Sequence, residues 1–368
     1  MLQTLQQQGL RHVVLCPGSR SGPLALAAAG LKRSGLITLS TAIDERSAGF
    51  HALGRSTASG VATAVITTSG TAVANLLPAA VEADRSSQPL LLISADRPLR
   101  LKNKGANQTV NQEAFLTPVC RWCGSGPLDG LNTGLDHELR ALAQNAWRHL
   151  HQQPGPVHLN VPFEEPLLPD LNQQNAFWNQ WNRSEPEAIT HTPELWTPAS
   201  NNAAPALDPD QPGVIVAGPW RGLSSTLEAY QAALIAWQQR SGWPVLADPL
   251  AAIPNDLSGV IRYWDLLLPH GLSQMPANAQ VLRLGSMPAS RRLEAWLESQ
   301  QGPQLLITEA DPRPLDPLEV AQQWSGGLSQ WWQQLSPQLN AIPAGSCAPT
   351  PQTRSVLESW ENADAAVG

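Results

Sequence analysis

Five short apolar runs without alternating polar residues occur in the first 165 residues, and Ala/Leu-rich segments of helical length separate them. The runs are residues 12–16, 36–40, 61–67, 90–94 and 157–161. Strands that are buried on both faces of a parallel sheet have this pattern. Strands and helices alternating at this spacing predict a doubly wound, parallel α/β sheet over residues 1–165.

The composition changes at about residue 166. Residues 166–211 are rich in Pro, Asn and Gln and carry isolated tryptophans without a helical period, which predicts an extended linker. Residues 212–335 return to apolar runs and amphipathic segments, such as "GVIVAGP" and "TLEAYQAALIAWQQRSG", and predict a second α/β domain. Residues 336–368 turn proline- and serine-rich and end in a short helix-like piece, so we expect a linker toward a further domain.

Polar or glycine-containing segments follow four of the predicted strands. They read "CPGSRS", "TAIDER", "TTSGTA" and "SADRP", and a long loop, "LRLKNKGANQTVNQ", continues from the last of them. In a doubly wound sheet, ligands bind beyond the carboxyl ends of the strands. Any one of these segments could be an ordinary turn. Because all four are expected along one edge, together they predict a binding site there.

Length and charge narrow the class of protein. The chain has 368 residues, long enough for two domains of ordinary size, and a net charge of −7. Nucleic-acid binding needs a basic face, so we expect no nucleic-acid partner. The sequence has neither an apolar run long enough to span a membrane nor the pattern of a signal peptide. We therefore expect a cytoplasmic protein that handles small molecules and has no membrane partner.

The four cysteines are too few and too scattered to predict a disulfide framework. Cys120 and Cys123 form a C-x-x-C pair, but no second pair completes a zinc site. The pair also does not open a predicted helix, as redox motifs of this spacing do. The sequence therefore favours a structural role for these two cysteines.

Five motifs occur in an order and at a spacing that a known superfamily shares. They are "CPGSRSGPLALA", "DERSAGFHALG", "TSGTAVANLLPAAVEA", "LLLISADRP" and "GANQTVNQ". They resemble the pyrimidine-binding domain of thiamine-diphosphate enzymes. Within that superfamily they resemble the 2-succinyl-5-enolpyruvyl-6-hydroxy-3-cyclohexene-1-carboxylate (SEPHCHC) synthases of menaquinone and phylloquinone biosynthesis. The resemblance covers residues 5–165, and more weakly residues 213–330, which resemble the central domain of that family.

The resemblance implies a transferase that decarboxylates 2-oxoglutarate and adds the succinyl-semialdehyde unit to isochorismate. It also implies thiamine diphosphate with Mg²⁺ or Mn²⁺ as cofactors, and a homodimer or homotetramer. The family holds its metal with a Gly-Asp-Gly segment, which this sequence lacks. We therefore expect no metal ligand in this chain, a diphosphate-binding domain that lies outside it, and no activity of this chain alone. Two alternatives stay open: another thiamine-dependent 2-oxoacid decarboxylase, and a non-catalytic α/β binding module.

Glu45 is the candidate catalytic residue. By the resemblance, its carboxyl group contacts the cofactor and shares a proton with the aminopyrimidine ring. A glutamate at a strand end facing an apolar crevice suits this role, because desolvation favours its neutral form. The alternative is an ordinary helix N-terminus, with Asp44 as the cap and Glu45 stabilised by the helix dipole. Both descriptions can hold at once, since Asp44 can cap the helix while Glu45 contacts the cofactor.

Three polar residues at the carboxyl ends of the strands are candidate substrate ligands. Arg20 carries a guanidinium whose two-pronged geometry matches a carboxylate, and both implied substrates carry carboxylates. By the resemblance, Ser19 and Arg20 contact isochorismate, whereas the alternative for Arg20 is a surface arginine. Arg97 is expected to contact substrate or intermediate, and its alternative is a salt bridge to Asp96 or to a neighbouring loop.

The remaining candidates lie in two loops and in the second domain. Thr68, Ser69 and Gly70 form a small-residue turn that lets the flat pyrimidine ring lie against the backbone. Gln108 lies in a loop long enough to be functional, and its side-chain amide can bind substrate or cofactor. In the second domain, Arg291 opens a predicted helix and is the candidate basic residue that reaches the substrate, its alternative being a solvated helix end.

Overall fold

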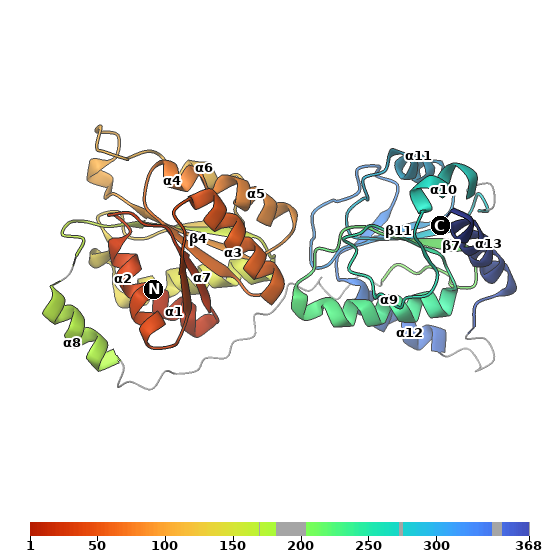
Figure 1. Ribbon diagram of the computed structural model, residues 1–368, viewed down its shortest axis with the longest axis horizontal. Helices are drawn as coiled ribbons and strands as arrows, with labels where there is room; N and C mark the ends of the chain where they lie inside the picture. The colour runs from red at the N-terminus through yellow and green to blue at the C-terminus, as the bar shows by residue number, and fades with distance from the viewer. Residues whose placement is uncertain (169, 182–203, 272–274, 341–347, 368) are drawn as a thin grey trace. The chain divides into compact units, whose positions relative to one another are not determined.

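A computed structural model describes residues 1–168, 170–181, 204–271, 275–340 and 348–367 (Figure 1). The chain divides into two compact units, Met1–Trp196 and Thr197–Gly368. Each unit is built around its own six-stranded sheet, in which every neighbouring pair of strands is parallel. The predicted class, two α/β domains with parallel sheets, is therefore confirmed.

The sheet of the first unit has the strand order β2-β1-β3-β4-β6-β5. Its strands are β1 (His12–Leu15), β2 (Thr38–Thr41), β3 (Thr63–Thr67), β4 (Leu90–Asp96), β5 (Trp122–Ser125) and β6 (Pro156–Pro162). β3, β4 and β6 are buried along their whole length. β3 and most of β4 are accordingly apolar or small, whereas β6 carries the buried polar residues His158 and Asn160 between apolar ones. The strand order reverses between β1 and β3, so the crevice for a ligand opens beyond the carboxyl ends of these two strands.

Helices cover both faces of this sheet. They are α1 (Leu2–Gln8), α2 (Gly22–Arg33), α3 (Glu45–Ser59), α4 (Thr71–Ala74), α5 (Leu77–Arg85), α6 (Glu113–Leu116), α7 (Asp136–Gln152) and α8 (Leu171–Trp181). Apolar residues of α1, α2 and α7 pack with one face of the sheet, and those of α3 to α6 pack with the other. Two short 3₁₀ helices, η1 (Leu99–Leu101) and η2 (Leu131–Thr133), lie in the connections.

The sheet of the second unit has the order β12-β11-β10-β7-β8-β9. Its strands are β7 (Gly213–Ala217), β8 (Val245–Ala247), β9 (Val260–Ile261), β10 (Gln280–Leu284), β11 (Gln304–Ile307) and β12 (Gln322–Trp324). Its helices are η3 (Ser224–Thr226), α9 (Leu227–Ser241), α10 (Trp264–Gly271), α11 (Arg291–Ser299), α12 (Leu328–Asn340) and α13 (Pro351–Val367). Here the order reverses between β7 and β10.

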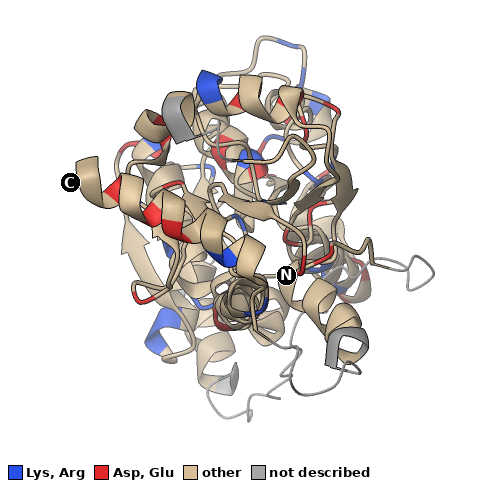
Figure 2. Ribbon diagram, turned by 90° about the vertical axis from the view of Figure 1, so that its right-hand side faces the viewer, with Lys and Arg blue, Asp and Glu red and all other residues tan. Residues whose placement is uncertain are grey.

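Tryptophans build much of the core of the second unit. Trp237 of α9 and Trp331 of α12 are fully buried, with ring centroids 4.8 Å apart, and this contact joins the two helices on one face of the sheet. On the other face, Trp360 of α13 is buried with apolar residues of α10 and α11. Figure 2 shows α13 ending at the C mark with acidic residues on its outer side, where Glu358 and Glu361 are exposed.

Three parts of the chain differ from the sequence-based prediction. Within the expected linker at 166–211, α8 is helical because Trp178 packs over Gly30 of α2, while residues 182–203 lie outside the described residues. Within 336–368, α13 packs into the second unit, and residues 341–347 lie outside the described residues. The Ala/Leu-rich segment between the apolar runs 61–67 and 90–94 forms two helices, α4 and α5, and not one, with Pro78 at the start of the second.

Across the parts of the chain that the structure describes, no helix combines the length and the apolar character needed to cross a membrane.

Candidate active site

The loops that follow β1 and β3 meet directly at the crevice of the first unit. A Cβ atom at Gly18 would lie 2.4 Å from Cβ of Thr68, so a side chain there would push the two loops apart. In the first loop, Ser21 Oγ donates to the Gly18 carbonyl at 3.0 Å, and the amide of Gly22 donates to the Ser19 carbonyl at 3.0 Å. This tight turn leads into α2 and places Arg20 at the edge of the crevice.

Arg20 is buried, with 9% of its surface exposed. Its Nη1 donates to the Phe163 carbonyl at 2.9 Å, and its Nη2 lies 3.2 Å from Glu165 Oε1. Its Nε is buried without a hydrogen-bond partner among the described residues. A buried donor without a partner is costly, so an anionic ligand that reaches this nitrogen would gain a charge-assisted hydrogen bond. The alternative of a surface arginine is wrong.

Arg97 is buried beside Arg20 and belongs to the same edge. Its Nη1 donates to Ser69 Oγ at 2.5 Å and to the Gln108 carbonyl at 2.9 Å. Burial, and next the charge of Arg20, lower the pKa of Arg97. The carboxylate of Asp96 instead forms an ion pair with Lys102, at 2.7 Å. Two buried cations that repel each other make an environment that favours a bound carboxylate.

The loop that carries Gln108 packs against the "TSG" turn. A Cβ atom at Gly70 would lie 3.4 Å from the Gln108 carbonyl oxygen, whereas the Gln108 side chain is exposed. Gln112, buried further along this loop, holds the turn: its Oε1 accepts from the Gly70 amide at 3.0 Å. Its Nε2 donates to Asn160 Oδ1 at 2.7 Å, so the amide is satisfied at both ends.

Glu45 begins α3, just beyond the carboxyl end of β2. Asp44 caps this helix by accepting from the Ser47 amide at 2.7 Å, as expected from the sequence. Glu45 is half-buried, and its Oε2 accepts from Asn75 Nδ2 at 3.3 Å. Two residues before it, Ile43 is 88% exposed, an unusual exposure for an aliphatic side chain. The carboxylate therefore lies at the edge of an exposed apolar surface.

The candidate residues do not all converge. Thr68 and Ser69 are buried at the crevice, whereas Ser19 is exposed on its outer side. Arg291 is exposed at the first position of α11 in the second unit. The roles assigned to these residues stay predictions.

Glu165 was not predicted as a site residue, and Gln112 was predicted only as a weaker candidate than Gln108. Glu165 follows β6, whose carboxyl end lies on the same edge as the other loops. Its position directly after a buried strand was the sequence signal that could have indicated a site residue. For Gln112 the sequence signal was weaker, because the role of a buried amide is clear only when its hydrogen-bond partners are known. Those partners are in Gly70, Ser94, Ala95 and Asn160.

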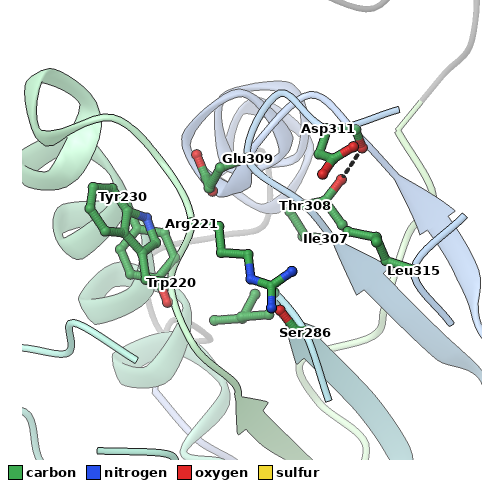
Figure 3. Close-up of a pocket in the computed structure, with 11 residues that line it drawn as sticks. Trp220, Arg221, Tyr230, Ser286, Ile307, Thr308, Glu309, Asp311 and Leu315 are labelled. Carbon is green, nitrogen blue, oxygen red and sulfur yellow. Dashed lines mark hydrogen bonds between the residues drawn. The ribbon is translucent and has the colours of Figure 1, made fainter. Parts of the chain in front are cut away.

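Each unit also contains a cavity beside its sheet. In the first unit, a cavity of about 660 Å³ lies between α2, α8 and the segment after β6, with Phe163, Glu165 and Trp178 in its wall. In the second unit, Trp220, Arg221 and Ser286 line a cavity of about 20 Å³ at the carboxyl ends of β7 and β10 (Figure 3). That volume holds about one water molecule.

The carboxyl group of Glu309 also lines the cavity in the second unit. Figure 3 shows Glu309 on one side of Arg221 and the rings of Trp220 and Tyr230 on another. Burial raises the pKa of Glu309, whose carboxylate accepts from the Leu328 amide at 2.9 Å. Neither cavity includes the residues predicted for catalysis.

Comparison with known proteins follows the division into two units. Residues 1–115 match the family model of the thiamine pyrophosphate enzyme, N-terminal TPP-binding domain, and residues 175–357 match the model of the middle domain of thiamine pyrophosphate enzymes. Thiamine pyrophosphate is thiamine diphosphate. The chain therefore belongs to the thiamine-diphosphate enzymes, and its two units are their N-terminal and middle domains.

Within that class, the chain is similar to proteins named 2-succinyl-5-enolpyruvyl-6-hydroxy-3-cyclohexene-1-carboxylate synthase. The one from Synechococcus sp. (strain CC9311) is 83% identical over 364 residues, which cover 99% of this chain and 63% of that protein. The one from Prochlorococcus marinus (strain MIT 9313) is 55% identical over 364 residues, covering 97% and 62%. The chain thus spans about three-fifths of the length of these relatives.

Proposed function

We propose that this chain contributes the aminopyrimidine-binding and carboxylate-binding residues of a SEPHCHC synthase. The reaction is the decarboxylation of 2-oxoglutarate and the transfer of the succinyl-semialdehyde unit to isochorismate. One observation carries the proposal: two buried guanidinium groups, Arg20 and Arg97, lie at the crevice where the N-terminal domain matches a thiamine-binding family. Paired guanidinium groups suit substrates that carry two carboxylates.

The described residues fit one end of thiamine diphosphate. Glu45 offers a half-buried carboxylate, and Thr68 to Gly70 offer a turn of small residues held by Gln112. Among the described residues, no group of three or more His, Cys, Asp and Glu side chains could hold a metal ion. We assign no residue of this chain to the diphosphate or to its Mg²⁺ or Mn²⁺.

The chemistry divides between the cofactor and the chain. When bound, thiamine diphosphate supplies the electron sink for decarboxylation. Glu45 holds a proton at a ring nitrogen of the aminopyrimidine, a transfer that suits a partly desolvated carboxyl group. Arg20 and Arg97 bind substrate carboxylates, and Ser69 orients Arg97 by accepting its hydrogen bond. The paired arginines favour this reaction over decarboxylation of a 2-oxoacid with a single carboxylate.

The assembly is also part of the proposal. The exposed Ile43 beside Glu45, together with Phe50, which is 44% exposed on the same helix, marks a surface that another polypeptide would cover. This surface supports a homodimer or homotetramer in which a second subunit closes the site. We further propose that the enzyme works in the cytoplasm, where soluble 2-oxoglutarate is available.

The test joins this chain to the part of the Synechococcus sp. (strain CC9311) relative that it does not match. The purified fusion is mixed with thiamine diphosphate, Mg²⁺, 2-oxoglutarate and isochorismate, and the product is identified by mass. We expect the fusion to release CO₂ and to form the SEPHCHC product. The Arg20→Ala, Arg97→Ala double variant, given the same two substrates, should do neither. CO₂ release with no use of isochorismate would support the simple decarboxylase instead.

A further inference from the structure

Arg97 is held at both of its ends. At the backbone, its amide donates to Asp96 Oδ1 at 2.8 Å. At the guanidinium, Nη1 donates to Ser69 Oγ at 2.5 Å. The next peptide unit is held by Gln112, whose Oε1 accepts from the Gly70 amide at 3.0 Å. The position of the Arg97 guanidinium therefore depends on what holds Gln112.

One buried amide side chain, that of Asn160, connects Gln112 back to Asp96. Asn160 Nδ2 donates to Asp96 Oδ2 at 2.9 Å, and Asn160 Oδ1 accepts from Gln112 Nε2 at 2.7 Å. All three side chains are almost completely buried. The two oxygens of one carboxylate thus begin two routes to Arg97. Oδ1 reaches its backbone amide directly, and Oδ2 reaches its guanidinium through two side-chain amides and the turn at Gly70.

The two ends of this hydrogen-bonded chain determine the direction of the amides between them. An ionised carboxylate can only accept hydrogen bonds, and a backbone amide can only donate them. Asn160 and Gln112 must therefore both turn their NH₂ groups toward Asp96. If either amide were reversed, two donors or two acceptors would face each other in a buried place, which is costly. Lys102 favours the ionised form of Asp96, with Nζ 2.7 Å from Oδ2.

We propose that Asp96 is a positioning residue for Arg97, whose guanidinium it aligns through the two buried amides. This assignment rests on the proposed function, in which Arg97 binds a substrate carboxylate. Because the Asp96 carboxylate pairs with Lys102, the guanidinium of Arg97 stays bound to Ser69 at the crevice. The charge of Asp96 thus orders the substrate-binding group from behind the turn.

Asp96→Asn removes the charge and keeps the shape of the side chain. While the asparagine oxygen accepts from the Arg97 amide, its NH₂ group faces Asn160 Nδ2, so two donors meet. Relieving that contact reverses Asn160 and then Gln112. The NH₂ group of Gln112 then faces the Gly70 amide, which loses its acceptor. The substitution should therefore act on the turn although it lies two side chains away.

The first measurement is amide hydrogen exchange at Gly70 in the purified chain, which needs neither cofactor nor turnover. We expect about tenfold faster exchange in Asp96→Asn, the effect of one lost hydrogen bond. Glu113→Gln is the matched control, because Glu113 Oε1 also accepts from Asn160 Nδ2, at 3.0 Å, and the glutamine oxygen can still accept. Exchange in this control should stay within about twofold of the unaltered chain. Unchanged exchange in Asp96→Asn, or an equal increase in both variants, overturns the proposal.

A double variant tests the direction of the amides. In Asp96→Asn with Gln112→Glu, the new carboxylate can accept both from the Gly70 amide and from the reversed Asn160. We therefore expect exchange at Gly70 to return to within about threefold of the unaltered chain. Two independent losses of packing would instead add. Exchange as fast as in Asp96→Asn, or faster, contradicts the proposal.

Gln112→Met tests the same chain of hydrogen bonds if Asp96→Asn does not fold. Methionine has a similar length and leaves every charge in place, but it offers the Gly70 amide no oxygen. We expect about tenfold faster exchange at Gly70. The Gly60 amide, at the end of α3, should not change, which shows that the chain is folded. Unchanged exchange at Gly70 overturns the proposal.

The second measurement is substrate kinetics in the fusion. We expect Asp96→Asn to raise KM by about tenfold for the same substrate that Arg97→Lys affects. In the Arg97→Lys background, Asp96→Asn should raise that KM by less than about twofold further, because both changes act on one contact. Multiplication of the two effects, or a change confined to the other substrate, overturns the proposal. If Arg97→Lys changes neither KM, the proposed function is wrong at Arg97, and amide exchange at Gly70 still decides whether Asp96 orders the turn.

Discussion

Arg20 and Glu165 form a partly open ion pair at the crevice edge. The Arg20 side chain is 10% exposed and that of Glu165 is 67% exposed. A pair with one exposed partner contributes little to stability, about 0–1 kcal/mol, because water screens it. A substrate carboxylate can therefore replace Glu165 at a small cost, and Glu165 acts as a competitor for the arginine.

Replacing Arg20 by lysine tests its role directly. Lysine keeps the charge but cannot present two parallel N–H donors to a carboxylate. We expect Arg20→Lys in the fusion to raise KM for one substrate by about tenfold or more, the cost of a charge-assisted hydrogen bond. Exchange of the C2 hydrogen of the cofactor, measured without substrate, should not change. A similar loss in substrate-free exchange would mean that Arg20 supports the fold rather than the substrate.

Replacing Glu165 should act in the opposite direction. We expect Glu165→Gln to tighten binding of 2-oxoglutarate, measured by calorimetry on the fusion, by up to about fivefold, the equivalent of an exposed ion pair. Glu164→Gln is the matched control, because Glu164 forms its ion pair with Arg100 instead, at 2.7 Å. Weaker binding in Glu165→Gln, or the same change in both variants, contradicts the competition.

At the scale of elements, burial decided what could be predicted. β3 and β4 were predicted because they are buried on both faces and read as apolar runs. β5 was missed because it is a four-residue edge strand, "WCGS", with no apolar run to mark it. α8 was missed because its packing depends on Gly30, far away in the sequence, which no local pattern reveals.

The contact between α8 and α2 can be tested at Gly30. A Cβ atom there would lie 1.9 Å from the Trp178 ring, so Gly30→Ala should displace α8 from α2. We expect faster proteolysis within α8 and a loss of about 1–3 kcal/mol in the free energy of unfolding. The control is Gly54→Ala in α3, where nothing lies within 4 Å and alanine should stabilise the helix by about 0.5–1 kcal/mol. Unchanged proteolysis of α8 would contradict this packing.

His151, at the end of α7, makes the first unit sensitive to acid. Burial lowers its pKa to about 4, and its Nε2 accepts from the Ala62 amide at 3.3 Å. The unfolded chain binds a proton near pH 6.5 and the folded chain only near pH 4, so stability is full above pH 6.5 and falls as the pH drops toward 4. Between pH 7.5 and pH 5, we expect a loss of about 2 kcal/mol from this residue.

Urea unfolding at the two pH values, followed by tryptophan fluorescence, measures this loss. His151→Gln keeps a hydrogen-bond donor and an acceptor but does not titrate. Between pH 7.5 and pH 5, its free energy of unfolding should therefore fall by about 2 kcal/mol less than that of the unaltered chain. Trp147 reports locally, because its ring lies 4.5 Å from that of His151. An equal pH dependence in both proteins would show that His151 is already protonated or already exposed in the folded state.

At the scale of the whole molecule, the sequence predicted the class of fold, which the structure confirms, and that the candidate residues lie along one edge of the first sheet. It placed Arg20, Arg97 and Ser69 near one another, because the carboxyl ends of parallel strands share an edge. It could not predict that Ser69 accepts from Arg97, or that Gln112 holds Gly70, since such contacts depend on side-chain packing between separate loops.

The role of Arg291 in the second unit, as a basic residue that reaches the substrate, stays a prediction. Arg292, its neighbour, forms an ion pair with Asp265 at 3.3 Å, and Arg291 stays exposed at the start of α11. This exposure agrees equally with a solvated helix end and with a residue that reaches a ligand. Kinetics of Arg291→Ala in the fusion, compared with Arg292→Ala, would separate the two roles.

We propose that Glu45, at the edge of the first sheet, holds a proton at a ring nitrogen of the aminopyrimidine of thiamine diphosphate. The most direct measurement is the rate of C2 hydrogen exchange of the cofactor in the fusion, for the unaltered chain and for Glu45→Gln. Glu82→Gln, at an exposed position on α5, is the control. We predict that Glu45→Gln slows exchange by about a hundredfold or more, the usual effect of losing an acid–base partner, while cofactor binding weakens much less. An unchanged exchange rate in Glu45→Gln would contradict the claim.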